Sequence, residues 1–308
     1  MLDVNRLRVI DAVARHGSVT AAAKELHYSQ PSVTHHLARL ETATGAQLVQ
    51  RVGRGIRLTQ AGQLLAERAA EIIGRIDAAD AELSAHVGLT AGRVRLAGYS
   101  SAIGSLVPQA VAALARKHPG LQIGLTDVHP PDAIDLLRAG RIEVAIIFRY
   151  DDTEPEPVGV RLHHLLDDPL YLLSTERGSE LASLHDATWI AGCDRCRSQL
   201  LSLCADAGFE PRIGYSSDDM VVMQALVAAG LGVTTLPGLA LSAHRAEGIV
   251  ASELPGSQRH VYAATYGEPP DPPATAALLA ALAEAAATDV GGAGPPASRH
   301  VTRRGGTS

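Results

Sequence analysis

The stretch 17–41, GSVTAAAKELHYSQPSVTHHLARLE, decides the N-terminal fold, because it carries the signals for two short helices joined by a tight turn. Ser18 and Ser29 are placed as N-caps, and Pro31 sits in the first turn of the second helix, where a missing N–H is tolerated. Apolar residues follow at helical spacing in both segments, so each has one stripe to bury. Three consecutive alanines let the second helix cross the first closely. The stretch predicts a helix-turn-helix.

Polar residues remain on the outer face of the second helix, where they suit base edges in the major groove. The alternative is an ordinary helix pair with a solvated polar face. The flanking segments favour DNA binding: residues 3–15 predict a helix that packs beneath the pair, and 48–58, LVQRVGRGIRL, predicts a two-stranded wing with arginines placed for phosphates. The expected contacts are Gln30, Thr34, His35 and Arg39 on the helix, and Arg51, Arg54 and Arg57 on the wing.

Charge is distributed unevenly along the chain. The formal net charge is −6, yet residues 1–58 hold eight Lys and Arg against four Asp and Glu, so this segment carries +4 and the rest −10. A basic head on an acidic body is typical of a protein that presents one end to DNA. The N-terminus lacks the apolar segment of a signal peptide, which predicts a soluble cytoplasmic protein. Three cysteines, an odd number, argue against a disulfide framework.

Residues 59–87 predict one long helix, capped by Thr59 and ended by Gly88. Its apolar positions recur at alternating spacings of four and three for three heptads. Such a helix is about 43 Å long at ~1.5 Å per residue, too long for one side of a small domain. We therefore expect its seam to dimerise; the alternative is that it lies against its own C-terminal domain. The predicted dimerisation residues are Leu65, Ala69, Ile72, Ile76 and Leu83.

Strands and helices alternate from residue 93 onward, which predicts an α/β fold with parallel sheets. The acidic, Pro-rich stretch 150–159 indicates a boundary between two subdomains with a cleft between them. The Gly-rich end has little to bury and is predicted to be disordered. The predicted division is a winged helix-turn-helix at 1–58, a linker helix at 59–88, an effector domain at 92–288 and a tail at 289–308. Within the effector domain, subdomain I comprises 92–160 and 266–288, and subdomain II comprises 161–265.

Along nearly its whole length the chain resembles the LysR-type transcriptional regulators. The matching pieces are VIDAVARHGSVTAAAKELHYSQPSVTHHLARLE, TGAQLVQRVGRGIRLTQAG, SLVPQAVAALARKHPGLQI, LLRAGRIEVAII, AGFEP and VAAGLGVTTLP. The resemblance implies an N-terminal all-α winged helix-turn-helix, a linker helix that pairs protomers, and a periplasmic-binding-protein-like domain for a small-molecule effector. It implies double-stranded DNA as a partner, a homodimer or homotetramer, and RNA polymerase as a further partner. We expect no cofactor, no metal site and no membrane association. The resemblance places base and backbone contacts on Gln30, Pro31, Thr34, His35 and Arg54. The predicted DNA-binding residues also include Ser29, Ser32, Arg39 and Arg51.

The resemblance also implies that the effector lies between the subdomains, at strand ends and helix N-termini. Ser100 and Ser101 precede a helix whose free N–H groups can receive a carboxylate, although helix capping explains them equally well. Arg149 ends a buried strand and can pair with an anionic ligand; the alternative is a surface ion pair with nearby acids. The predicted effector-binding residues are Ser100, Ser101, His129, Arg149, Cys193 and Asp218.

The three cysteines lie together in 192–204, GCDRCRSQLLSLC. A zinc site there lacks a full ligand set. Thiol-based redox sensing through Cys196 and Cys204 is the stronger alternative, because the resemblance includes peroxide-sensing members with two cysteines in this region; the simplest role is that of a small buried hydrophobe. A small-molecule enzyme is the alternative from another class. The chain has no Gly-x-Ser-x-Gly elbow or Walker loop, so we expect no catalytic activity.

Overall fold

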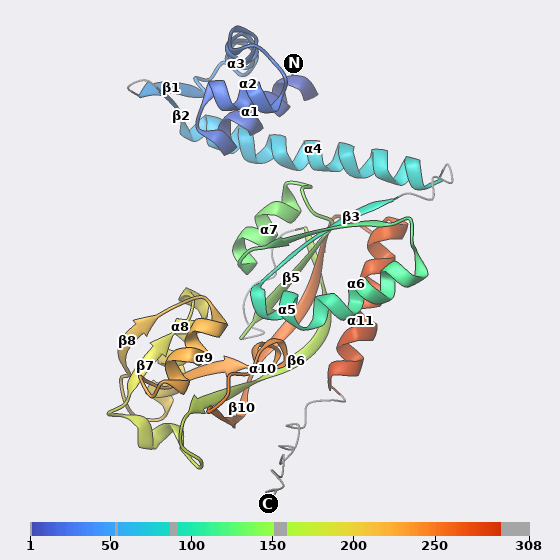
Figure 1. Ribbon diagram of the computed structural model, residues 1–308. Coiled ribbons are helices and arrows are strands. Elements are labelled where there is room, and N and C mark those ends of the chain that lie inside the picture. Colours follow the sequence, from blue (N-terminus) through green and yellow to red (C-terminus); the bar gives the residue numbers. More distant parts are fainter. Residues whose placement is uncertain (1, 53–54, 87–91, 151–158, 291–308) are drawn as a thin grey trace, which may run out of the picture.

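The computed structural model describes residues 2–52, 55–86, 92–150 and 159–290. In Figure 1 a small helical head, one long helix and an α/β domain follow one another along the chain. The head has the predicted order of helices and wing strands; residues 53–54 of the wing turn lie outside the described part. Its elements are α1 (Val4–His16), α2 (Val19–Glu25), α3 (Gln30–Thr44), β1 (Val49–Val52) and β2 (Gly55–Leu58).

The head is organised by the predicted caps and buried stripes. The hydroxyl oxygens of Ser18 and Ser29 each accept from the backbone N–H three residues on, at 3.4 and 3.3 Å. His27, in the turn between the helices, has φ 55°, a left-handed conformation that favours glycine. Thr59 caps the long helix α4 (Gln60–His86), as predicted. The stripe of α3 is fully buried against α1 and α2 through Val33, Leu37 and Leu40.

One face of α4 belongs to the core of the head. Ala66, Ala69 and Ile73 are buried there, and Leu65 packs against the same cluster while half-buried. The prediction that Ala69 lies on a free dimer seam is therefore wrong. The apolar face of α1 packs against α4, so some of the heptad positions predicted to contact a second protomer are buried within the same chain.

Another face of α4 lies on the C-terminal domain. Gly74 and Gly140 meet backbone to backbone: a Cβ on Gly74 would lie 2.4 Å from the Gly140 Cα, so only glycine fits. The Arg75 guanidinium lies 5.8 Å from the centroid of the Tyr266 ring. The alternative prediction, a helix lying on its own C-terminal domain, thus holds for this part of α4.

The remaining seam residues are accessible. Ile72 and Leu83 are 40% and 65% exposed, and Ile76 is half-buried. These three keep the predicted spacing of four and seven along one stripe of the helix. They remain candidates for contact with a second protomer. The predicted helix end, Gly88, lies outside the described residues.

The C-terminal domain is built on a six-stranded sheet in the order β4-β3-β5-β10-β6-β9. Its first three strands are parallel, as predicted. The prediction of parallel sheets throughout is wrong, because β10 pairs antiparallel with both β5 and β6, and β9 pairs antiparallel with β6. The strands are β3 (Arg93–Gly98), β4 (Gln122–Asp127), β5 (Val144–Arg149), β6 (Val160–Ser174), β9 (Thr234–Pro237) and β10 (Val250–Tyr266). The helices beside the parallel strands are α5 (Ser100–Gly104), α6 (Leu106–Lys117) and α7 (Pro130–Arg138), with α11 (Pro273–Val290) packed on α6.

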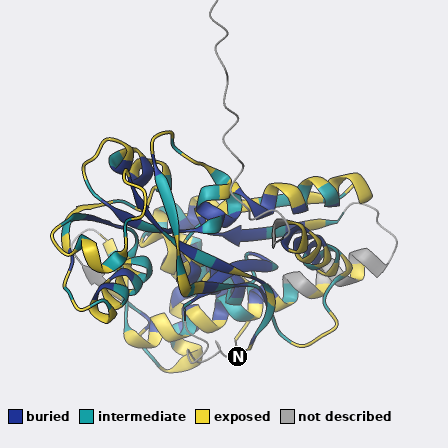
Figure 2. Ribbon diagram, turned by 90° about the horizontal axis from the view of Figure 1, so that it is seen from below, coloured by how far each residue is buried: buried dark blue, intermediate teal, exposed yellow. Residues whose placement is uncertain are grey.

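A second, smaller unit surrounds the parallel pair β7 (Thr188–Ala191) and β8 (Arg212–Ser216). Its helices are α8 (Asp194–Asp206), α9 (Met220–Ala228), α10 (Gly238–Ala243) and the 3-10 turn Leu181–Leu184. Figure 2 shows the strands as the buried interior, with helices exposed on their outer sides. Within the described residues, no helix has the length and apolar character needed to cross a membrane.

The long strands β6 and β10 run through both units (Figure 1). Val261 and Ala263 pack in the cluster of α6 and α11, whereas Leu172 and Leu173 pack in the clusters of the second unit. The core of subdomain I therefore includes residues of β6 after the predicted bound at 160 and residues of β10 before the predicted bound at 266. The predicted Pro-rich boundary is largely outside the described residues, as are residues 291–308 of the tail; α11 includes its first two residues.

Candidate functional site

The exposed face of α3 carries the side chains predicted to read DNA. Gln30, Thr34, His35 and Arg39 are all exposed, as are Ser29 and Pro31, whereas Ser32 is half-buried. The Gln30 Nε2 donates to the Thr20 hydroxyl at 2.5 Å, which links this face to α2. Arg51 lies on β1, but its side chain and the whole of residue 54 lie outside the described part. The sequence did not predict the stacking of His36 on Tyr28, with ring centroids 5.6 Å apart, which braces the turn before α3.

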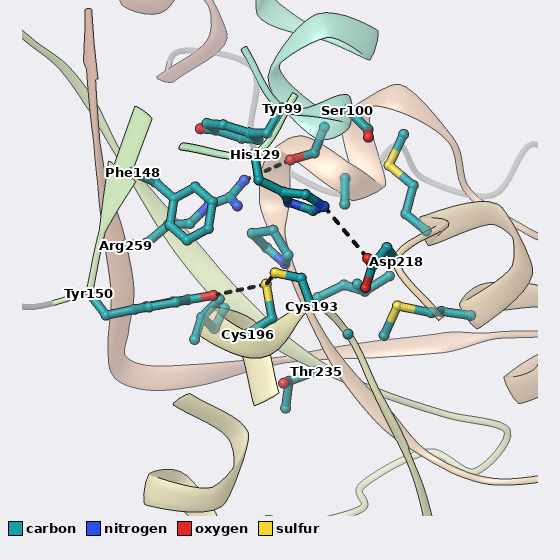
Figure 3. Close-up of a pocket in the computed structure, with 18 residues that line it drawn as sticks. Tyr99, Ser100, His129, Phe148, Tyr150, Cys193, Cys196, Asp218, Thr235 and Arg259 are labelled. Carbon is teal, nitrogen blue, oxygen red and sulfur yellow. Dashed lines mark hydrogen bonds and ion pairs between the residues drawn. The ribbon is translucent and has the colours of Figure 1, made fainter. Parts of the chain in front are cut away.

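A pocket lies between the two subdomains of the C-terminal domain (Figure 3). It encloses about 660 Å³ that is not occupied by protein, a volume that includes solvent at its mouth. Its wall is mainly apolar or aromatic, from Tyr99, Phe148, Tyr150, Leu170, Met220, Met223, Leu236, Pro237 and Ala240. The polar lining comes from Ser100, Ser101, His129, Cys193, Cys196, Asp218, Thr235 and Arg259.

Where β6 and β10 pass beside the pocket, a buried ion pair that the sequence did not predict forms part of its wall. Arg259 on β10 donates to the Asp168 carboxylate on β6 from Nε and Nη2, at 2.9 and 2.8 Å, and both side chains are 2% exposed. Nη2 of Arg259 also donates to the Ser101 hydroxyl at 2.9 Å. The guanidinium lies over the rings of Tyr99 and Phe148, 4.8 and 4.6 Å from their centroids. Burial raises the pKa of Asp168, and the positive charge of Arg259 opposes that rise.

Five of the six predicted effector residues line this pocket: Ser100, Ser101, His129, Cys193 and Asp218. The sixth, Arg149, does not, and that prediction is wrong. Successive residues of a strand point to opposite faces. On β5 the pocket face belongs to Phe148, so the next side chain, Arg149, points away and is 6% exposed. Its Nη2 has no hydrogen-bond partner among the described residues. The cation of the pocket is Arg259 instead.

One polar contact bridges the pocket mouth from one subdomain to the other. The Nε2 atom of His129, at the start of α7, lies 3.5 Å from the Asp218 carboxylate, which precedes α9 (Figure 3). Both side chains are at least half exposed, so this pair is screened by solvent and adds little stability. The Ser100 hydroxyl donates to Asp127 at 3.2 Å. Among the described lining residues, Arg259 and His129 thus each lie beside a carboxylate, that of Asp168 or of Asp218.

Two of the cysteines meet inside the pocket. Cys193 caps α8, and its Sγ lies 3.2 Å from the Sγ of Cys196 in the first turn. A hydrogen bond from Cys196 lowers the pKa of Cys193 to about 6, burial opposes that change, and the Cys196 backbone N–H and His129 add to it. The same contact and burial raise the pKa of Cys196, whose Sγ also accepts from the Tyr150 hydroxyl at 3.6 Å. Cys193 is thus the more nucleophilic thiol.

The sequence offered Cys196 and Cys204 as the cysteines of a redox-sensing alternative, but their positions in this structure do not allow a direct disulfide. Eight residues along α8 separate them, about 12 Å at ~1.5 Å per residue, whereas the Cα atoms of a disulfide lie about 4.4–6.8 Å apart. Cys204 is fully buried beside Trp189 and Leu200, and burial raises its pKa to about 11. It behaves as the small hydrophobe of the simplest interpretation.

Comparisons with known proteins agree with this architecture. The family described as the LysR substrate binding domain matches residues 88–287, and the bacterial regulatory helix-turn-helix proteins of the lysR family match residues 4–63. The HTH-type transcriptional regulator TfdS of Cupriavidus pinatubonensis is 30% identical, over 77% of this chain and 82% of that protein. The hydrogen peroxide-inducible genes activator of Pectobacterium carotovorum is 25% identical over 79% and 82%. Full-length CbnR in complex with its target DNA has the same fold, with a TM-score of 0.63 and 24% identity over 92% of this chain and 100% of that one.

The lowered pKa of Cys193 leads to a test by alkylation. The iodoacetamide rate at this thiol, followed by peptide mass spectrometry, should rise with pH to a midpoint near 6, because the thiolate is the nucleophile. Cys196→Ala removes the thiol that stabilises the thiolate, so its midpoint should move up towards that of an ordinary cysteine. A midpoint near ~8.5 in the unmodified protein would contradict the assigned geometry.

Proposed function

The chain belongs to the LysR family of transcriptional regulators, and we propose that it reads DNA with α3 and the wing under the control of a small molecule held in the pocket between its subdomains. It is a DNA-binding regulator with an effector-binding domain. The observation that carries the proposal is that one chain joins an exposed recognition face to a pocket through α4. We place it in the cytoplasm, with its DNA, propose RNA polymerase as a further partner, and propose no catalytic role.

The assignment of α3 can be tested with a matched pair of variants. Thr34→Ala/His35→Ala should lower affinity for specific DNA by about 1–3 kcal/mol per lost base contact and leave non-specific binding nearly unchanged. Thr42→Ala is the control, because the hydroxyls of Thr34 and Thr42 each donate to the backbone carbonyl four residues back. Gel shifts on the upstream region of its own gene give the readout. Equal loss in the two variants would mean that helix stability, not base contact, is responsible.

We propose that the effector is a small, largely apolar molecule with one or two hydrogen-bonding groups. Aromatic and aliphatic side chains form most of the pocket wall. Arg259 is neutralised by Asp168, and His129 lies beside Asp218, so the lining does not favour an anion over a neutral molecule. The sequence suggested a carboxylate at the N–H groups beside Ser100 and Ser101, and an anion at Arg149. Because Arg149 lies outside the pocket, the proposed effector does not need a negative charge.

Filling the pocket should abolish the response to the effector. Thr235 lines the cavity from β9 (Figure 3), so Thr235→Phe should occupy it, while Thr235→Val keeps its shape. In a thermal-shift screen of uncharged and anionic metabolites, a ligand at 100 times its Kd adds about 2.7 kcal/mol of stability. The shift should survive in the valine variant and vanish in the phenylalanine variant. A ligand that stabilises all three proteins equally would bind elsewhere.

We propose that protomers pair along the accessible stripe of α4, through Ile72, Ile76 and Leu83, next to the face that packs on α1. Ile72→Asp should separate the protomers, because it places a charge inside that apolar contact. Leu64→Asp is the matched control: Leu64 is 56% exposed on the same helix but lies off the stripe. Sedimentation should show a smaller assembly only for Ile72→Asp. An unchanged assembly would exclude this stripe as the interface.

A second candidate function is control by thiol oxidation, and the 3.2 Å contact between Cys193 and Cys196 favours it. Hydrogen peroxide would transfer one oxygen to the Cys193 thiolate, which takes up a proton to become a sulfenic acid, and the other oxygen would leave as water. Attack by the Cys196 thiol would then form the disulfide and release a second water. The chain should lose two hydrogens in mass and two titratable thiols, and its DNA affinity should change. Cys204→Ala should behave as wild type, whereas Cys193→Ser should not respond. Oxidation without any change in DNA affinity would exclude this candidate.

A further inference from the structure

A β-bulge changes which side chains share a face of β6. Leu166 pairs with Val261 and His164 pairs with Tyr262, so Leu165 is one extra residue on β6. Residues three apart on a regular strand point to opposite faces. The extra residue in the bulge shifts the alternation of faces by one, so that His164 and Asp167 lie on the same face of the sheet.

His260 completes a cluster on that face. It pairs directly with Asp167 across the β6–β10 ladder. One carboxylate oxygen of Asp167 lies 2.8 Å from His164 Nε2 and 2.7 Å from His260 Nδ1, and the three candidate ligand atoms all lie within 4.8 Å of one another. Arg259, the neighbour of His260, lines the pocket, so the cluster lies on the opposite side of the sheet from the effector.

The chemistry of the cluster suits a divalent transition metal. Two imidazole nitrogens and one carboxylate form a ligand set used for zinc and for iron, with remaining positions open to water. Tetrahedral zinc with bonds of about 2.0–2.1 Å holds neighbouring ligand atoms about 3.3 Å apart. The two contacts of Asp167 therefore need to lengthen by about half an ångström, and the two imidazole nitrogens, which lie within 4.8 Å of each other, can reach this spacing by a side-chain adjustment. The side chains are 50%, 47% and 21% exposed, which leaves a path from solvent.

We propose that a divalent transition metal ion, represented here by zinc, binds to His164, Asp167 and His260. The ion would link β6 to β10 where these strands run between the two subdomains. For binding, each imidazole presents a lone pair and keeps its proton on the other ring nitrogen. Arg149, the ladder partner of His260 on β5, adds a positive charge to this face. The site should therefore bind zinc more weakly than a closed structural site.

The test uses full-length protein and zinc chloride alone. Because the Cys193–Cys196 pair can also hold zinc, both residues are first changed to serine. After chelator treatment, calorimetry should show one ion per chain, and His164→Gln or His260→Gln should weaken binding at least tenfold. The matched control is His163→Gln: His163 contacts the Thr265 hydroxyl and points to the other face of β6.

The outcomes are distinct. Zinc should raise the melting temperature of the protein in which Cys193 and Cys196 are serine, and that of the His163→Gln variant, but not that of His164→Gln. Circular dichroism would identify a variant that fails to fold, and Asp167→Asn then provides a smaller change at the same site. No binding at 100-fold molar excess, or binding equally strong in the His164→Gln and His163→Gln variants, would overturn the proposal. Neither result bears on DNA or effector binding.

Discussion

The buried ion pair between Arg259 and Asp168 is the constraint on which the effector domain depends. Removing two charges from water costs several kcal/mol for each ion. The attraction between the ions offsets this cost only where their remaining hydrogen-bond donors and acceptors also have partners. Here the Asp168 oxygen not used by Arg259 accepts from the Leu239 backbone N–H at 3.0 Å. Arg259 has a hydroxyl partner in Ser101 and two aromatic faces. The pair joins the two long strands, and its further hydrogen-bond partners come from α5 and α10.

This arrangement explains how a ligand can influence DNA without touching it. The pocket is lined from both subdomains, so a ligand favours the spacing that suits its contacts, and couplings of about 1–3 kcal/mol are ordinary. Subdomain I meets α4 at Gly74 and Gly140, where the two backbones leave no room for a side chain. The same helix contributes Ala69 to the core of the head. Because α4 packs closely on both parts, we expect a shift of subdomain I to move α4 and the DNA-binding head with it.

The sequence was most informative where the signals are local. Caps at Ser18, Ser29 and Thr59 and the stripe of α3 depend on neighbours within one or two turns, and the structure has them as predicted. Arg149 was misassigned because one step along a strand reverses its face. Arg259 was not found, because its partner Asp168 is distant in sequence and meets it only where β10 returns beside β6. The bulge that gathers the histidine cluster is likewise a property of paired strands, not of either segment alone.

The most direct test of the role of the ion pair is a double-mutant cycle with Asp168→Asn and Arg259→Gln. Urea unfolding can be followed by the fluorescence of the single tryptophan, Trp189, which is fully buried in the second unit. Asp168→Asn alone should cost about 3–5 kcal/mol, because it leaves a buried guanidinium without its counter-ion. The double variant should lose at least about 1 kcal/mol less than the sum of the two single losses. Two single losses below about 1 kcal/mol that simply add would contradict the account.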